Sequence, residues 1–125
     1  MARPEHAALD RERLQELREE LGEDALDDII ERFCTQAQIR LDELSTAVSE
    51  RDCESIDRLA HSLRGSSLNI GARTMSELCS ELELEAFSPD AERMGEGLRQ
   101  LEDAFETTQM ALNPTGQKGQ AYAKR

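Results

Sequence analysis

Apolar side chains recur every three or four residues along most of this chain, and this spacing predicts a succession of amphipathic α-helices. The second stretch is the longest and fits one face of a helix of about 28 residues. No alternating strand pattern competes with these stretches. The inward positions of the five expected helices are Leu14, Leu17 and Leu21; Leu26, Ile29, Ile30, Phe33, Ala37, Leu41, Leu44 and Val48; Ile56, Leu59, Ala60, Leu63, Ser67 and Ile70; Met75, Leu78, Cys79, Leu82 and Ala86; and Met94, Leu98, Leu101, Phe105 and Leu112.

Start and stop signals separate these stretches. Short polar side chains before a helix accept hydrogen bonds from its unpaired N–H groups, and glycine readily ends a helix. The start signals are Asp10, Asp52, the pair Thr74 and Glu77 at capping-box spacing, and Ser88 followed by Pro89. The stop signals are Gly22 and Gly71.

Each expected helix is apolar on one side only, and the connections between helices are short. Such helices bury their apolar sides by packing antiparallel. The pattern therefore predicts an all-α fold, an up-and-down antiparallel four-helix bundle with a short additional N-terminal helix. We assign the bundle to residues 1–112 and expect residues 113–125, which are basic and lack periodicity, to form a disordered tail.

Composition narrows the function classes. The 125 residues include three Phe, one Tyr and no Trp, which argues against an all-β sandwich and against a module that stacks on nucleic-acid bases. The net charge of −12 disfavours nucleic acid and anionic membranes as partners. No apolar run approaches the roughly 20 residues of a membrane span. We therefore expect a cytoplasmic chain that binds neither nucleic acid nor membrane.

Two further features bear on a site. Residues 51–73 carry four arginines against three acidic side chains, so an anion is tolerated there despite the acidic character of the chain. The three cysteines lie about 20 residues or more apart, with no close Cys or His pair for zinc. We expect no metal site, and we interpret Cys34 and Cys79 as small core residues.

One of the two histidines occupies an unusual position. At about 100° per residue, His61 points roughly 150° away from the inward side of its helix, so it is expected to be exposed. Gly65 points roughly 170° away, although a glycine inside a helix costs about 1 kcal/mol relative to alanine. The missing side chain leaves room for a partner to approach the imidazole one turn earlier. We interpret His6 as incidental.

Arg64 and Leu68 lie on the same outer side of this helix. Arg64 brings a fixed positive charge suited to a phosphoryl group, and Leu68 adds exposed apolar surface of the kind that makes a docking contact. These residues form one patch with His61 and Gly65. In it, His61 fits a nucleophile and Arg64 a stabiliser of charge. Gly65 leaves space for a partner, and Leu68 offers an apolar contact to it.

The segment AHSLRGSSLNIGA, residues 60–72, closely resembles the phosphoacceptor helix of histidine-containing phosphotransfer (HPt) domains. Those domains carry His-x-x-Lys/Arg-Gly-Ser/Ala-Ser/Ala followed by a glycine near the helix end. The matching residues here are His61, Arg64, Gly65, Ser66, Ser67 and Gly71. Arg64 stands where lysine is commoner, but the charge is retained. The motif covers about a tenth of the chain, and the helix order agrees over roughly residues 8–112.

The resemblance implies a phosphorelay intermediate of a two-component system. His61 would accept a phosphoryl group from the phospho-aspartate of a receiver domain and pass it to another receiver's aspartate, with Arg64 stabilising its charge. In related domains a polar residue on the next helix orients the imidazole, and the matching position is Glu83. The partner face is expected to include Gly65, Leu68, Arg58, Ser62 and Asn69.

The chain shows no phosphate-binding Gly loop and no nucleotide motif, so we expect a carrier that is not an enzyme and has no ATP site of its own. No cofactor is expected; any magnesium would be held by the acidic pocket of the receiver. The expected partners are response-regulator receiver domains and a hybrid histidine kinase, and the chain is expected to be monomeric.

Two alternatives remain at this point, and a third is excluded. The chain could be a helical adaptor that binds a receiver or histidine kinase through the same patch without carrying phosphate. It could be the phosphotransfer part of a histidine kinase, separated from the catalytic part. A metal-storing bundle would need Glu-x-x-His, but Arg58 and Arg3 stand three residues before the two histidines.

Overall fold

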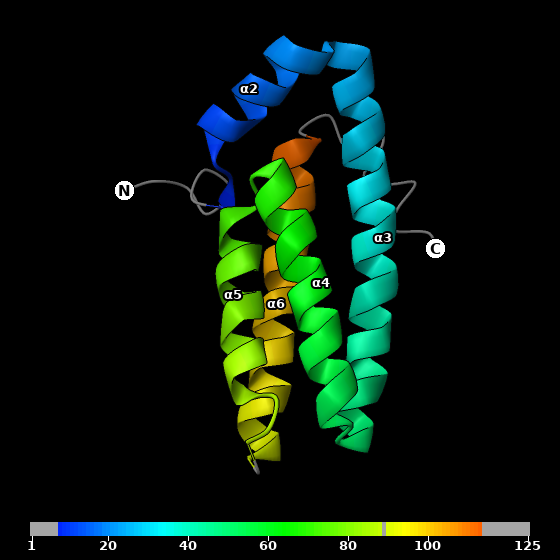
Figure 1. The fold of residues 1–125 in the computed structure, drawn as a ribbon, viewed down its shortest axis with the longest axis vertical. Coiled ribbons are helices and arrows are strands. Elements are labelled where there is room, and N and C mark those ends of the chain that lie inside the picture. Colours follow the sequence, from blue (N-terminus) through cyan, green and yellow to red (C-terminus); the bar gives the residue numbers. More distant parts are fainter. Residues whose placement is uncertain (1–7, 89, 114–125) are drawn as a thin grey trace.

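A computed structural model describes residues 8–88 and 90–113, and within these ranges the chain is helical apart from short connections. Helices α3 to α6 run alternately up and down beside one another, and α2 lies across the end of the bundle where α3 begins (Figure 1). The expected antiparallel four-helix bundle with a short additional N-terminal helix is therefore confirmed. The helices are α2 (Arg11–Leu21), α3 (Glu23–Glu50), α4 (Cys53–Ile70), α5 (Arg73–Glu85) and α6 (Ala91–Leu112).

The helix starts agree with the sequence at two positions and differ at two. Asp10 and Asp52 cap α2 and α4 through their carboxylates, as predicted. The capping box expected before α5 is wrong, because Ala72 is the N-cap and the helix already begins at Arg73. The connection from α4 consists of two residues, so α5 starts as soon as the chain has turned. Helix α6 begins after Ser88, with Asp90 as its N-cap.

Most of the inward positions that the spacing predicts lie in the core, and Ile29, Val48, Leu78 and Leu112 are partly buried against it. Cys34 and Cys79 have no exposed surface, which confirms their expected place in the core. Burial raises the pKa of both thiols to about 12, so neither is a reactive thiolate at neutral pH. Leu21 is an exception: it is the last residue of α2, at the corner where the chain turns into α3, and it is 44% exposed.

Hydrogen bonds connect the start of α2 to the end of α4. The N–H of Asp10 donates to the carbonyl oxygen of Gly71 at 2.7 Å, and the Arg13 guanidinium donates to the carbonyl of Asn69 at 2.9 Å and to its side-chain oxygen at 3.2 Å. Leu9 and Ala72 form an isolated β-bridge beside these contacts. The segment before α2 and the first turn of α2 therefore hold the C-terminal end of the helix that carries His61.

Gly71 makes this close approach possible, and its replacement gives a test. Its φ of 82° lies in the left-handed region, and an added Cβ would lie 3.0 Å from the Asp10 carbonyl oxygen. We expect Gly71→Ala to lower the free energy of unfolding by about 1–3 kcal/mol, measured by urea denaturation. Gly65→Ala is the matched control, because nothing lies within 4 Å of an added Cβ there. A Gly71→Ala protein as stable as the control would contradict this account.

Some sequence predictions fall outside the described ranges. These are the interpretation of His6, the part of the start signal at Pro89, and the tail from residue 114 onward. Among the described helices, none is both long enough and apolar enough to cross a membrane.

Candidate functional site

His61 lies near the middle of α4 with its imidazole turned away from the core. Its side chain is 68% exposed, which agrees with the outward direction expected from the helical spacing. Ala60, the preceding residue, is fully buried, as is Leu63 two positions later. Packing of the inward side of α4 therefore fixes the rotation of the helix and places the imidazole at the surface.

Two charged side chains meet His61 on the side toward α5. Glu83 reaches from α5 and places Oε2 3.1 Å from Nδ1 of His61. Its other oxygen accepts a hydrogen bond from Nε of Arg64 at 2.7 Å, and Nη2 of Arg64 lies 3.3 Å from the same Nδ1. The Glu83 side chain is only 20% exposed. We call these three residues the His61–Arg64–Glu83 cluster.

The cluster favours one tautomer of the imidazole. A carboxylate only accepts hydrogen bonds, so the contact with Glu83 is a bond when Nδ1 carries the proton. Arg64 only donates, but its contact to Nδ1 is the longer one and its Nε is already bonded to Glu83. With the proton on Nδ1, the lone pair of the neutral ring lies on Nε2. The arrangement thus leaves one nitrogen of an exposed ring free to attack an electrophile.

Open surface adjoins this ring on α4. Within the described part of the chain, an added Cβ at Gly65 would meet nothing within 4 Å, so packing there does not require the glycine. Leu68, one turn further, is 56% exposed. The glycine and the leucine therefore form an open, partly apolar surface next to the imidazole.

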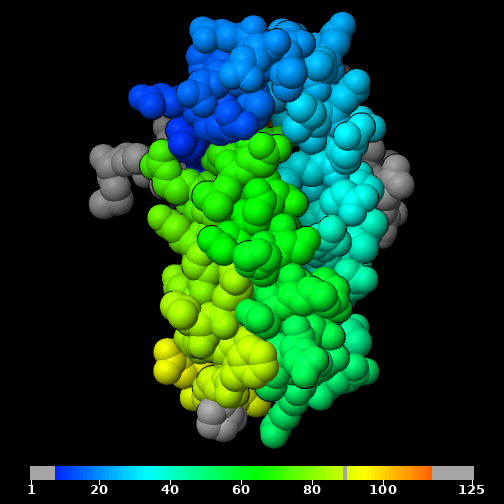
Figure 2. Space-filling model, viewed as in Figure 1, coloured from blue at the N-terminus to red at the C-terminus, as the bar shows by residue number. Residues whose placement is uncertain are grey.

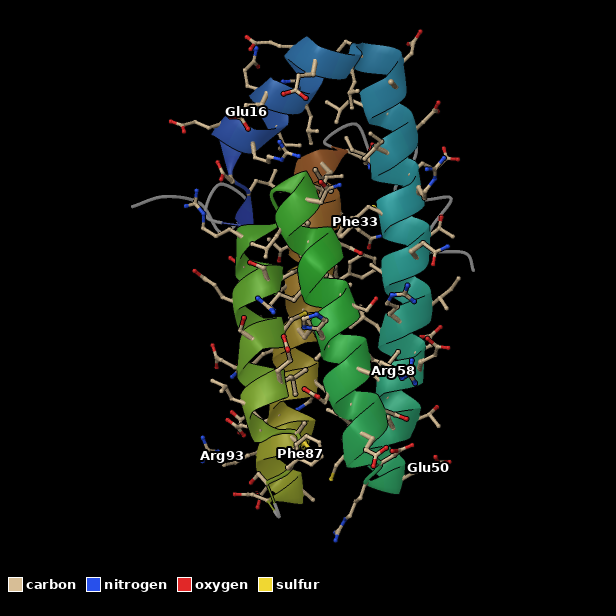
Figure 3. All side chains as sticks on the ribbon, in the orientation of Figure 1. Glu16, Phe33, Glu50, Arg58, Phe87 and Arg93 are labelled. Carbon is tan, nitrogen blue, oxygen red and sulfur yellow. The ribbon has the colours of Figure 1, made fainter. Side chains whose placement is uncertain are left out.

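The other residues expected on the partner face lie rotated about 60–100° from His61 around α4. Arg58 is exposed and lies on the side of α4 that faces α3 (Figure 3). Ser62 is half-buried, and its carbonyl accepts a hydrogen bond from Ser66. Asn69 is exposed, but its side-chain oxygen already accepts from Arg13. It also borders a groove of about 340 Å³ between α3 and α4. The expected face therefore spreads over two sides of the helix.

Two exposed apolar residues escaped the sequence analysis. Leu84 is 86% exposed in the last turn of α5, and Phe87 is 65% exposed just beyond it. Phe87 lies on the near face of the molecule where the chain leaves α5 (Figure 3). Their signal in the sequence is that both depart from the inward spacing of Leu82 and Ala86.

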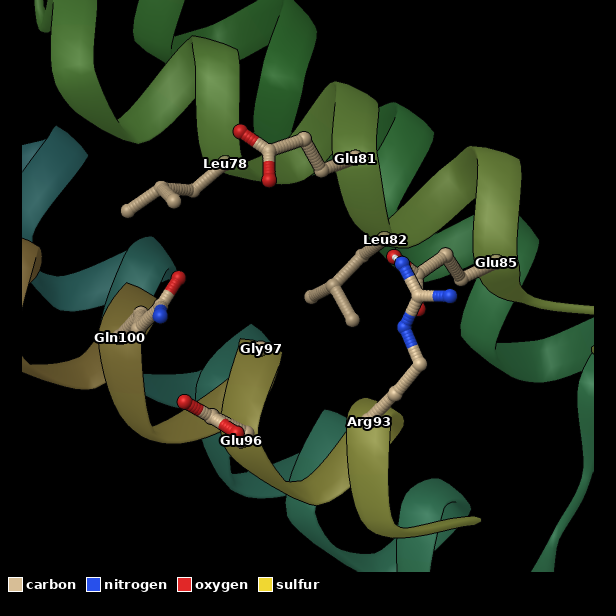
Figure 4. A pocket seen from close by; sticks show the side chains of 8 residues that line it. All are labelled: Leu78, Glu81, Leu82, Glu85, Arg93, Glu96, Gly97 and Gln100. Carbon is tan, nitrogen blue, oxygen red and sulfur yellow. Dashed lines mark hydrogen bonds and ion pairs between the residues drawn. The ribbon is translucent and has the colours of Figure 1, made fainter. Parts of the chain in front are cut away.

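A small cavity lies on the other side of α5. It has a volume of about 180 Å³ and separates α5 from α6, with Arg93 paired to Glu85 at 3.0 Å across it (Figure 4). Its lining does not include the His61–Arg64–Glu83 cluster. Within the described ranges, no three His, Cys, Asp or Glu side chains come together as metal ligands.

Comparisons with known proteins place these observations in context. The family model described as "Hpt domain" matches residues 28–112. The sensor protein TorS of Escherichia coli strain K12 is 32% identical over 81 residues, which is 65% of this chain. That match spans 9% of the length of TorS.

Solved structures agree over almost the whole chain. Histidine-containing phosphotransfer protein B from Pseudomonas aeruginosa PAO1 superposes with a TM-score of 0.79 at 26% identity, covering 94% of this chain and 96% of that one. A putative histidine-containing phosphotransfer protein from rice gives a TM-score of 0.78 at 19% identity, covering 94% of this chain and 86% of that one, and at this identity the likeness is one of fold.

Proposed function

This chain belongs to the Hpt domain family, and from that premise we propose that His61 is the residue that carries the phosphoryl group. Members of the family are phosphotransfer proteins of two-component phosphorelays, and they are carriers, not kinases. The observation that supports His61 is its exposed ring, whose Nδ1 contacts Glu83 while Nε2 stays free.

The transfer step follows from this tautomer. Nε2 attacks the phosphorus of an aspartyl phosphate on a receiver domain, a P–N bond forms, and the P–O bond to the aspartate breaks. The electron pair leaves with the aspartate carboxylate, and the proton on Nδ1 stays on the ring, facing Glu83. Phosphohistidine then gives the group to a second aspartate by the reverse chemistry.

In this proposal, Arg64 offsets the negative charge of Glu83 next to His61. The Glu83 carboxylate that orients the ring would by itself repel an incoming phosphoryl group. The Arg64 guanidinium bonds to that carboxylate at 2.7 Å and offsets its charge, so the phosphoryl group approaches a balanced pair. The exposure of Arg64, 34% of its side chain, leaves part of the guanidinium accessible to the phosphoryl oxygens.

Glu83 acts as a positioning residue, and its replacement tests this role. We expect Glu83→Ala to slow phosphorylation of His61 about tenfold, because the ring loses its orienting partner. Glu83→Gln should restore most of the rate, since its side-chain oxygen can still accept from Nδ1. The ¹⁵N NMR shifts of the ring should move from the Nδ1–H form toward the Nε2–H form in Glu83→Ala alone. Unchanged shifts and rate in Glu83→Ala would exclude the role.

The proposal extends to partners and setting. We propose that the chain exchanges phosphoryl groups with response-regulator receiver domains, including that of a hybrid histidine kinase, and that any magnesium is held by the receiver. It would act without an ATP site of its own, as a monomer in the cytoplasm. The monomer is supported by the open surface around His61, which a second copy on that face would cover.

The direct test is incubation with phosphorylated receiver domains. We expect a label on this chain that is labile in acid and stable in base, as a P–N bond is, and that maps to His61. A label that maps to another residue, or no label from any receiver in a broad panel, would overturn the proposal.

A further inference from the structure

Along the axis of the antiparallel α4–α5 pair, exposed apolar side chains lie on either side of the level of His61. Leu68 follows the histidine by seven residues, about 10 Å along the axis of α4. At the opposite end, Phe87 and Leu84 come from α5 and the connection that follows it. The other two phenylalanines of the chain are buried, at 7% and 4% exposure, whereas Phe87 is 65% exposed. A large aromatic side chain left in solvent is typical of a binding contact.

Two observations place Phe87 between the level of His61 and the first turn of α4. It follows Glu83, which contacts His61, by four residues, or about one helical turn. It also lines a groove of about 280 Å³ together with Cys53 in the first turn of α4. Cys53 precedes His61 by eight residues, which is about 12 Å along the helix axis.

We propose that Phe87 and Leu84 form an apolar docking platform for the receiver domain that exchanges the phosphoryl group with His61. The inference rests on the proposed function. A protein–protein interface of standard size covers about 800 Å² on each partner, a disc of about 16 Å radius. A receiver centred on His61 therefore covers both Leu68 and the Phe87–Leu84 platform, and its contact extends from α4 onto α5.

The position of the platform and the charge of the chain favour a receiver domain over a second copy of this chain as the occupant. A second copy bound to the platform would cover His61 and block the proposed phosphoryl transfer. It would also bring together two chains that each carry a net charge of −12.

The kinetic test separates docking from chemistry. We compare Phe87→Ser and Leu84→Ser with Met110→Ser, a matched control on α6 that is 61% exposed. The partner is the receiver that labels the wild type fastest in a panel of purified phosphorylated receivers. We expect both platform variants to raise the receiver concentration for half-maximal transfer at least tenfold, with the maximal rate unchanged. Met110→Ser should stay within twofold of wild type. Platform variants that behave like Met110→Ser would overturn the proposal.

Two further readouts keep the outcomes distinct. Phosphoramidate, a small phosphoryl donor, needs no docking and should label His61 equally in the platform variants and in wild type. Failure to label wild type at His61 would count against the proposed function and not against the platform.

Cys53 is the half-buried thiol of the groove, whereas Cys34 and Cys79 are fully buried, so iodoacetamide should modify Cys53. We expect bound receiver to slow this modification at least fivefold; an unchanged rate at saturating receiver would contradict the platform.

Discussion

The His61→Gln protein is expected to accept no phosphoryl group from any receiver domain, a complete loss of function. The glutamine amide resembles the imidazole in size and polarity, but its nitrogen lone pair is delocalised into the carbonyl and cannot attack phosphorus. Because the His61 side chain is 68% exposed, the replacement leaves the core untouched and the free energy of unfolding should stay within about 0.5 kcal/mol of wild type.

The measurement is the acid-labile, base-stable label after incubation with a phosphorylated receiver, with folding checked by circular dichroism. His6→Gln is the matched control, since it removes the other histidine of the chain and should keep the full label. A label that persists in His61→Gln would show that another residue carries the group. Receiver binding without any label in the wild type would instead indicate an adaptor that does not carry phosphate.

For Gly65→Gln we expect stability and transfer to change in opposite directions. Glutamine is the better helix former, and nothing lies within 4 Å of an added Cβ at this position, so the free energy of unfolding should rise by up to about 1 kcal/mol. The longer side chain occupies the space one turn from His61 that a receiver must enter. A displacement of about 1 Å at the reacting atoms can cost about a hundredfold in rate, and we expect a loss of this size.

A smaller substitution, a small phosphoryl donor and a stability measurement serve as controls for Gly65→Gln. Gly65→Ala adds a single methyl group and should transfer at nearly the wild-type rate. Phosphoramidate is small enough to pass the glutamine and should label His61 in Gly65→Gln as fast as in wild type. Urea denaturation checks the expected gain in stability. Equal transfer rates from a receiver to Gly65→Gln and to wild type would mean that clearance at this position has no role.

The start of α4 depends on local interactions, whereas the start of α5 depends on tertiary contacts. Asp52 accepts from the N–H of Ser55 within its own turn, an interaction that the neighbouring residues alone determine. The start of α5 depends on Ala72, which is held by the carbonyl of Ser67 at 2.8 Å and by the bridge to Leu9. The capping-box pattern of Thr74 and Glu77 is overridden there, because tertiary contacts turn the chain into the helix before that pattern is reached.

The sequence alone predicts the bundle and the outward direction of His61, because both follow from the rotation of about 100° per residue within single helices. It suggested Glu83 only through family resemblance. His61 and Glu83 stand eleven residues on either side of Ala72, so the short connection brings them to one level of the antiparallel pair. Whether their side chains meet depends on how each helix is rotated about its axis.

That rotation is set by the packing of buried residues from different helices, among them Leu63 of α4 and Cys79 of α5. The 3.1 Å contact between Glu83 and His61, and the place of Phe87 beside the first turn of α4, are therefore decided by the tertiary structure. The spacing of apolar residues predicts the direction in which a side chain leaves its own helix. Which side chains of other helices it contacts depends on how the helices pack in the core.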